Sequence, residues 1–183
     1  MIDRRARARA GFSIVELLVV VVILGLLAGV TTVSWTSVMP QTALNSDVRA
    51  LSSRIHGTRS DAISRNVEFQ IVYDIDENRY WVRPPFNEDG EFEPREEERA
   101  QLYATDLSPG VEFREITIDG RTFNDGVVQV RFDPLGASND HTILLHHVTF
   151  DRYHTIEVLA LTGLIRFHDG IFERDEVDDG DFD

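Results

Sequence analysis

The carboxyl group of Glu16 occupies the position in this sequence that most requires a chemical explanation. It lies near the start of an apolar stretch, and residues 17–30 follow it without a polar side chain. An ionisable residue within a membrane span costs about 2.5–3.5 kcal/mol on insertion scales, so it usually has a partner and a function. Glu16 is therefore a candidate for an ion pair in low dielectric, where a single charge is costly. The alternative is a carboxyl group that reaches the membrane interface or stays protonated.

The apolar stretch has the length and the flanking charges of a membrane helix. Residues 12–30 make a segment of 19 residues, which spans about 28 Å as an α-helix, close to the thickness of one hydrocarbon core. Residues 1–10 carry four arginines against one aspartate. Arginines next to a span stay on the cytoplasmic side, so we expect the rest of the chain on the far side of the membrane.

Two ordinary interpretations of this segment leave the acid unexplained. A secretory signal peptide would be cut after the apolar run, near Leu27-Ala28-Gly29, where small residues occur. A plain single-span anchor would not be cut. Neither requires an ionisable side chain at Glu16.

The hexapeptide Gly11-Phe12-Ser13-Ile14-Val15-Glu16 resembles the cleavage motif of type IV prepilins and of type II secretion prepseudopilins. The resemblance implies that a prepilin peptidase cuts between Gly11 and Phe12. Residues 1–11 are then a leader peptide, and the new amino group of Phe12 is N-methylated. In a helical stack of subunits, the Glu16 carboxylate can pair with the Phe12 amine of a neighbouring subunit and set the register of assembly.

Two glycines within the apolar stretch are candidates for helix packing. Gly25 and Gly29 are four residues apart, a spacing that lets membrane helices approach closely. The alternative is that glycine is simply common in transmembrane helices.

A second helical pattern follows the apolar stretch. Apolar side chains recur at steps of three and four residues between Leu44 and Ile63, with polar side chains between them, which indicates a helix with one docked face. Pro40 lies between the two patterns and is expected to kink or interrupt the helix. We expect one long helix over residues 12–66, transmembrane over residues 12–30 and packed on a sheet in its second half.

The period of the apolar residues changes to about 2 after Asn66, which indicates strands. The expected strands cover residues 67–73, 80–83, 111–118, 127–132, 141–150, 153–161 and 164–167. They predict a β-rich globular domain over residues 67–172, in which the strands form an antiparallel β-sheet or small β-sandwich. The predicted fold class is therefore α+β, with the long helix packed on this domain.

Two acidic stretches are not expected to belong to the core. Residues 87–99 hold seven acids against two arginines, and residues 173–183 hold seven acids against one. We expect an exposed loop and a solvated acidic tail. Calcium binding to the tail or to the turn at residues 74–77 is the alternative, but neither stretch has the full spacing of an EF-hand loop.

The sequence contains no catalytic, cofactor or metal motif that we can identify. His146 and His147 are adjacent in an expected strand, so they should point to opposite faces and cannot act as a simple metal-binding pair. No nucleophile elbow, phosphate-binding loop or dinucleotide fingerprint occurs. The absence of cysteine excludes disulfides and thiolate sites. We therefore expect neither an enzyme nor a bound cofactor.

Two segments of the second half, Val130-Arg131-Phe132-Asp133-Pro134-Leu135-Gly136 and residues 156–165, resemble the GspH/FimT type of minor pseudopilin. Members of that family place a Phe-x-Pro-x-Gly turn before a paired strand and end in a Thr-Gly hairpin. The resemblance implies a type IV pilin-like fold and a structural subunit of the type II secretion pseudopilus, which contributes to protein export across the outer membrane. It also implies a single span in the inner membrane, a periplasmic C-terminal domain and other pseudopilins as partners. The alternatives are a FimT-like minor pilin of a type IV pilus and a membrane-anchored β-rich binding module.

The charge of the chain argues against a nucleic-acid partner. All 18 cationic residues are arginine, and 32 acids give a net charge of −14. Removal of residues 1–11 takes away four arginines and one aspartate, which leaves a net charge of −17. Such a surface repels phosphates.

Overall fold

The structure is a computed structural model of the 183-residue chain, and it describes residues 13–160 and 162–172, with the backbone alone for residues 27–41. The chain divides into two compact units, Met1–Met39 and Pro40–Asp183. The expected leader peptide and acidic tail lie outside the described residues.

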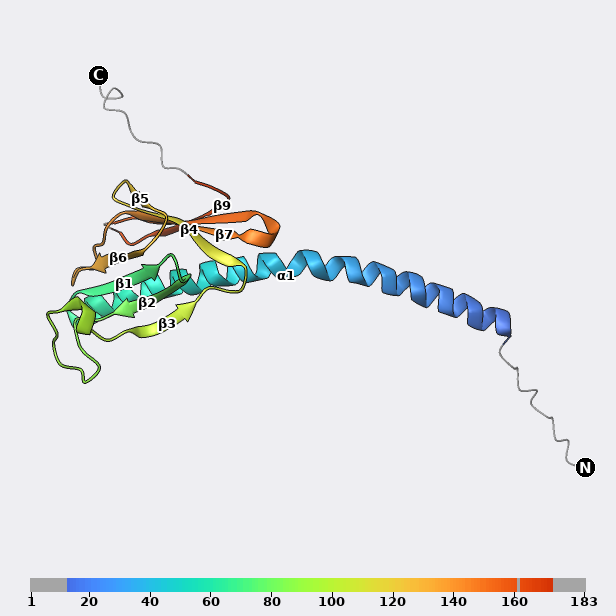
Figure 1. The fold of residues 1–183 in the computed structure, drawn as a ribbon, viewed down its shortest axis with the longest axis horizontal. Helices are drawn as coiled ribbons and strands as arrows, with labels where there is room; N and C mark the ends of the chain where they lie inside the picture. Colours follow the sequence, from blue (N-terminus) through green and yellow to red (C-terminus); the bar gives the residue numbers. More distant parts are fainter. Residues whose placement is uncertain (1–12, 161, 173–183) are drawn as a thin grey trace, which may run out of the picture. The chain divides into compact units, whose positions relative to one another are not determined.

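The long helix predicted from the sequence is α1, which runs from Ile14 to Arg65 (Figure 1). Its backbone is helical through Pro40, so the expected interruption at this residue was wrong. A proline removes one N–H donor from the ladder of helical hydrogen bonds, and the helical sequences on either side of it are long enough to continue the helix. The boundary between the two compact units nevertheless falls directly before Pro40.

Nine strands form two antiparallel sheets within the part of the chain that the structure describes. The first sheet has the order β3-β2-β1-β6 and the second the order β5-β4-β7-β8-β9. The strands are β1 (Phe69–Asp74), β2 (Arg79–Arg83), β3 (Leu102–Asp106), β4 (Val111–Ile118), β5 (Arg121–Phe123), β6 (Val127–Phe132), β7 (His141–His147), β8 (Arg152–Val158) and β9 (Ile165–Asp169). Two short 3₁₀ helices, η1 (Glu96–Glu98) and η2 (Val148–Phe150), lie between strands. The predicted α+β architecture is confirmed.

Most differences from the predicted strands have a local cause. The strand expected at residues 141–150 ends at His147, because η2 follows it and Asp151 adopts a left-handed φ of 48°. Strand β3 was not predicted, and none of its side chains is buried, so it lacks the alternation by which a half-buried strand is recognised. Strand β5 was also missed, since it contains three residues that are all exposed.

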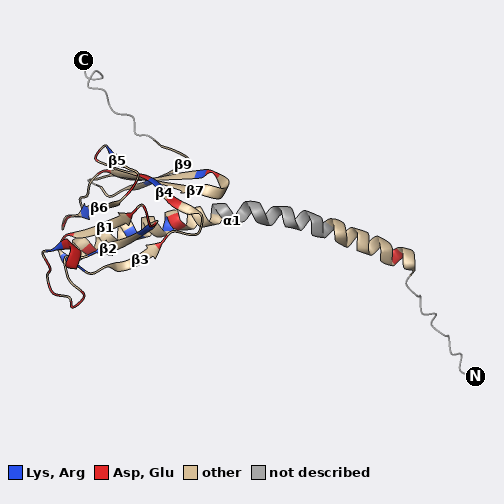
Figure 2. Ribbon diagram, viewed as in Figure 1, with Lys and Arg blue, Asp and Glu red and all other residues tan. Residues whose placement is uncertain are grey.

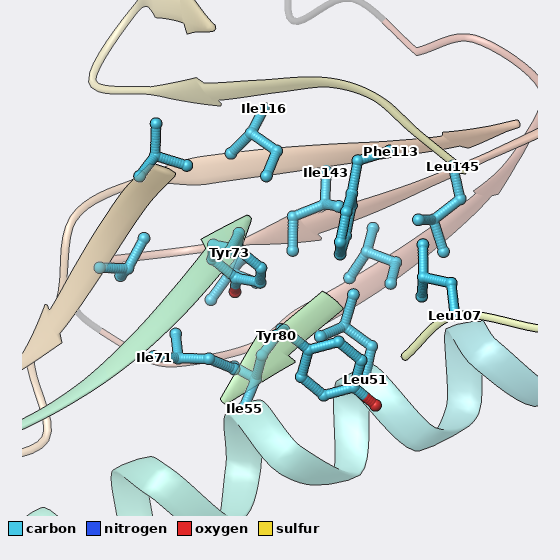
Figure 3. Packing of buried hydrophobic residues seen from close by; sticks show 14 of the residues in the cluster. Leu51, Ile55, Ile71, Tyr73, Tyr80, Leu107, Phe113, Ile116, Ile143 and Leu145 are labelled. Carbon is cyan, nitrogen blue, oxygen red and sulfur yellow. The ribbon is translucent and has the colours of Figure 1, made fainter. Parts of the chain in front are cut away.

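The core of the second unit lies between α1 and the inner faces of both sheets (Figure 3). Helix α1 contributes Leu51 and Ile55, which are at most 1% exposed. The first sheet contributes residues such as Tyr73, and the second contributes residues such as Ile143, both fully buried. The expected docked face of α1 is confirmed. Its buried apolar members are Leu44, Val48, Leu51, Ile55 and Ala62.

Candidate assembly site

The first turn of α1 carries Glu16, the acid that the sequence singled out. Its backbone N–H donates a hydrogen bond to the carbonyl oxygen of Ser13, 3.0 Å away. A carboxylate is favoured here because the exposed N–H groups of a helix start carry partial positive charge. The apolar side chains that follow are all well exposed in their own unit, from 45% at Val20 to 68% at Leu26. In this stretch of 13 residues from Ile14 to Leu26, the large apolar side chains are exposed on all sides of the helix.

The other predicted residues of this segment are described only in part. Gly11 and Phe12 lie outside the described residues. A Cβ atom added to Gly25 would meet nothing within 4 Å, and the side-chain surroundings of Gly29 are not described. No helix in the described part of the chain is long and apolar enough to span a membrane. The predicted span over residues 12–30 extends beyond the described side chains at both ends and stays a prediction.

In the second unit, Arg59 joins α1 to the two turns that carried the family resemblance. Its Nε donates a hydrogen bond to the carbonyl oxygen of Gly136, 2.9 Å away. A Cβ atom added to Gly136 would lie 2.6 Å from Cδ1 of Ile63, and one added to Gly163 would overlap the Arg59 side chain. Both glycines have positive φ, 81° and 61°. The sequence carries a weak signal for this contact, because Arg59 lies on the docked face four residues after the buried Ile55.

The Phe-x-Pro-x-Gly turn is closed by the side chain of Asp133. Its Oδ1 accepts hydrogen bonds from the N–H groups of Leu135 and Ala137, both at 2.8 Å. The N–H of Ser138 then donates to the carbonyl oxygen of Ala160, 3.1 Å away, so the two turns are joined to each other. They form one platform against the end of α1.

A buried carboxylate fixes α1 to the loop before β4. Asp47, which is 9% exposed, accepts hydrogen bonds from both the N–H and the hydroxyl of Ser108, each at 2.9 Å. These charge-assisted bonds satisfy an acid that would otherwise be costly to bury. Together with Arg59, Asp47 holds the helix to the β-rich domain at both ends of the docked face.

The acidic stretch of residues 87–99 is ordered and anchored through Glu96. Its Oε1 accepts hydrogen bonds from Gln70 of β1, at 3.0 Å, and from Arg131 of β6, at 2.8 Å. Its Oε2 accepts one from Gln129, at 3.1 Å, and lies 3.9 Å from Arg83 of β2. Figure 2 shows the acids of η1 beside these strands. The predicted exposed loop therefore covers the outer face of the first sheet.

The Glu96 contacts also lower the pKa of its own carboxyl group. Hydrogen bonds from Gln70 and Gln129 lower the pKa of the Glu96 carboxyl, and the charges of Arg131 and Arg83 act in the same direction. Sequence reasoning missed the hydrogen bonds of Glu96 because their donors, Gln70, Gln129 and Arg131, are 26 to 35 residues away along the chain.

The three histidines of β7 have structural roles in the second sheet. Burial lowers the pKa of His141 to about 4, and its Nδ1 lies 3.0 Å from the carbonyl oxygen of Asn139, so the ring is neutral and Nδ1 donates. His146 stacks on Tyr153 with ring centroids 4.3 Å apart, whereas His147 is buried and contacts Phe150. The two therefore lie on opposite faces, as predicted. No group of three or more His, Asp or Glu among the described residues is placed to hold a metal ion.

Comparison with known proteins gives one finding on the amino-terminal segment and one on the fold. The chain matches the prokaryotic N-terminal methylation motif over residues 6–32. No curated protein matches it. Two solved structures of the minor pseudopilin EpsH from the type II secretion system of Vibrio cholerae are similar to it, with TM-scores of 0.50 and 0.53 and sequence identities of 12% and 13%. The matched regions cover 69% and 74% of this chain and 97% and 99% of the EpsH chains.

The two findings concern different parts of the molecule. The methylation motif covers the amino-terminal segment in which the cleavage hexapeptide was recognised. The likeness to EpsH establishes the fold, because the matched regions extend over most of this chain. The predicted pilin-like α+β fold is confirmed.

Proposed function

We propose that this chain is a minor pseudopilin, a structural subunit of a type II secretion pseudopilus that contributes to protein export across the outer membrane. The observation that carries the proposal is the presence of the methylation motif and the EpsH fold in one chain. In this role the protein acts by assembly and not by catalysis. Its partners are the prepilin peptidase, the other pseudopilins and the inner membrane.

The amino-terminal segment supplies the chemistry of assembly. The peptidase cuts between Gly11 and Phe12, and the amino group of Phe12 is methylated. Glu16, in the first turn of α1, pairs with the Phe12 amine of the next subunit, because both charges are costly alone in low dielectric. Gly25 and Gly29 permit close approach of neighbouring helices.

The exposed apolar stretch at the start of α1 has two successive environments in this proposal. Its large side chains, from Ile14 to Leu26, are each at least 45% exposed in their own unit. They lie in the inner membrane before assembly and pack against other pseudopilins in the filament. The β-rich domain stays in the periplasm.

The contacts of α1 within the second unit attach the helix to the β-rich domain, so that the two move together. Asp47 holds the loop before β4, and Arg59 holds the two turns. A displacement of the helix during filament extension therefore carries the whole domain with it, because these contacts join α1 to loops of the β-rich domain at both ends of its docked face.

The second candidate is a FimT-like minor pilin of a type IV pilus. The charge disfavours its DNA-binding form, since the mature chain would carry a net charge of −17 and repel phosphates. Salt-sensitive DNA binding of low-micromolar affinity by the mature chain would favour that candidate instead.

The experiment that tests the proposal is co-expression of the full chain with a prepilin peptidase, followed by intact mass measurement and N-terminal sequencing. We expect a chain that begins at Phe12 and carries one added methyl group. Deletion of the gene should then abolish secretion through the associated system. A chain that begins at Met1, or shortly after Ala28, would contradict the filament role and favour an anchored or exported β-rich binding module.

A further inference from the structure

Strand β6 leaves one edge of the first sheet open. It pairs with β1 along its whole length and is the outermost strand on that side. On its other edge, the described residues make one isolated bridge, between Phe132 and Ser138. The backbone groups that point outward from residues 127–131 can therefore pair with another extended chain.

The outer strand on the other side of this sheet, β3, is less suited to such pairing. Tyr103 in β3 has a φ of 57°, and the register of β3 with β2 shifts between Tyr80 and Val82. An irregularity of this kind bends an edge strand and discourages pairing with a further strand. The pairing of β6 with β1 has no such shift.

A groove of about 550 Å³ lies along the first half of the open edge of β6, at residues 127–129. One wall is β6 itself and the other is the hairpin of β4 and β5, which lies near β6 in Figure 1. Four lining side chains are apolar, and two of them are well exposed, Phe123 at 37% and Val127 at 58%. The apolar lining residues are Ile118, Phe123, Val127 and Val128.

The groove also presents one cation. Arg121 lines it, and its side chain forms no ion pair or hydrogen bond with the described part of the chain. The acid in the lining, Asp119, already accepts a hydrogen bond from Asn139. The groove therefore combines an open backbone edge, apolar side chains and an available guanidinium group.

We infer that this groove binds an extended segment of a neighbouring, different pseudopilin, which adds as a strand to β6. The inference rests on the proposed function, which makes other pseudopilins the neighbours of this chain. The open edge selects an extended backbone, because only such a chain can pair with successive strand groups. The bound segment places apolar side chains against Phe123 and Val127 and a carboxylate beside Arg121.

Charge disfavours the two other occupants. A second copy of this chain would bring another net charge of −17 to the same surface. The acidic tail, residues 173–183, carries seven acids for one available arginine. The last described residue before it, Phe172, lies beside β8 and β9, because it stacks on His168 and donates its N–H to Thr155. This is the edge of the second sheet opposite β5, although 11 residues could extend up to about 40 Å.

The test is site-specific photocrosslinking of the full chain in cells that contain its secretion system. A photoreactive phenylalanine analogue replaces Phe123 in the groove or, as the control, Phe150 in η2, which is 44% exposed. We expect Phe123 to give an adduct with another pseudopilin at a yield about ten-fold above that of Phe150. The same adduct should form in a chain that ends at Phe172.

Two aspartate substitutions test the groove itself. Val127→Asp places an acid in the apolar contact and should reduce the adduct about ten-fold. Val148→Asp is the matched control, since Val148 is 54% exposed and lies outside the groove lining, and it should leave the yield unchanged. Both positions are exposed, so we expect both variants to fold.

Other results would overturn the inference. One is an equal yield of adduct from Phe123 and Phe150. Another is a crosslink within the chain that disappears when the chain is truncated at Phe172. A third is an adduct with a second copy of this chain or with a secreted substrate. Cleavage after Gly11 and methylation are measured in every variant. If the chain is processed and required for secretion but fails these tests, the groove inference alone fails. If it is neither processed nor required, the proposed function fails.

Discussion

The Nε of Arg59 donates a hydrogen bond to the carbonyl oxygen of Gly136 across 2.9 Å, although the two residues are 77 positions apart in the chain. The contact joins the docked face of α1 to the turn after β6. It is possible only because no Cβ atom stands between the turn and the helix, where Ile63 already packs. The hydrogen bond and the glycine are therefore two parts of one arrangement.

Substitution of Gly136 by alanine should strongly destabilise the domain. The new Cβ atom would lie 2.6 Å from Cδ1 of Ile63, and the backbone would have to keep a φ of 81°. Overpacking costs about 1–3 kcal/mol and a left-handed backbone about 1–2 kcal/mol. We expect Gly136→Ala to lower the free energy of unfolding by their sum, about 2–5 kcal/mol, measured by urea titration of the full chain in detergent.

The matched control for this prediction is Gly120→Ala. Gly120 has nearly the same φ, 78°, but a Cβ atom there meets nothing within 4 Å. Its cost should be the backbone strain alone, about 1–2 kcal/mol. Equal losses in the two variants would show that the contact with α1 contributes nothing.

Substitution of Glu96 by alanine should loosen the acidic loop from the outer face of the first sheet. The change removes the acceptor for Gln70, Gln129 and Arg131. We expect the free energy of unfolding to fall by about 1–3 kcal/mol, because the amide groups of the buried Gln70 and of Gln129 lose a charged acceptor. The neighbouring Glu97, which is exposed, is the control, and Glu97→Ala should stay within about 0.5 kcal/mol of the parent.

The effect of Glu96 should depend on pH in a defined direction. Its pKa is lowered in the folded chain from an ordinary value of 4.5. The stability it contributes is therefore fully present above that ordinary value and is lost as the pH falls through the folded pKa. The difference in the free energy of unfolding between the parent and Glu96→Ala should thus narrow below about pH 4.5. A difference that stays constant down to pH 2 would contradict the role of the ionised carboxylate.

The sequence predicts the elements whose side chains enter the core. The spacing of Leu44, Val48, Leu51 and Ile55 identifies the docked face of α1, and alternation identifies β4 and β6 at their observed bounds. Strand β3 has no such alternation, because all its side chains remain at least partly exposed. It pairs with β2 through backbone hydrogen bonds, and a pattern of side-chain types does not predict such pairing.

In the candidate site, too, the sequence predicts the local features but not the contacts between distant residues. Glu16 and the cleavage hexapeptide are local features, readable from residue types and spacing. The contacts of Arg59 and Glu96 join residues from 26 to 77 positions apart, and nothing in their local sequence names the partner. The groove beside β6 depends on how the edges of two sheets meet, which a one-dimensional pattern does not contain.

Substitution of His141 by phenylalanine should reduce the acid sensitivity of the domain. The folded pKa of His141 is lowered to about 4 by burial, against an ordinary value of 6.5. Between these values the unfolded chain binds the additional proton, so stability falls as the pH decreases from 6.5 towards 4. The loss is on the order of 3 kcal/mol by linkage. His141→Phe should lose this contribution and show a flatter profile between pH 7 and pH 4.

Two observations complete the His141 test. At pH 7.5 the variant also lacks the hydrogen bond to Asn139, so we expect a loss of about 1 kcal/mol there. His56 is exposed on α1, and His56→Phe should leave the acid profile unchanged. If His141→Phe and the parent lose stability in parallel as the pH falls, other groups cause the acid sensitivity.

Substitution of Glu16 by glutamine should separate processing from assembly. The cleavage site precedes Glu16, and the side chain lies in the first turn of α1, so the chain should still be cut after Gly11. Removal of one partner of an ion pair in low dielectric costs about 3–5 kcal/mol. Incorporation into sheared, sedimented filaments should therefore fall by more than about 100-fold. If Glu16 instead reaches the membrane interface or stays protonated, it forms no ion pair with a neighbouring subunit. Glutamine has nearly the same shape, so Glu16→Gln would then leave assembly at the parental level.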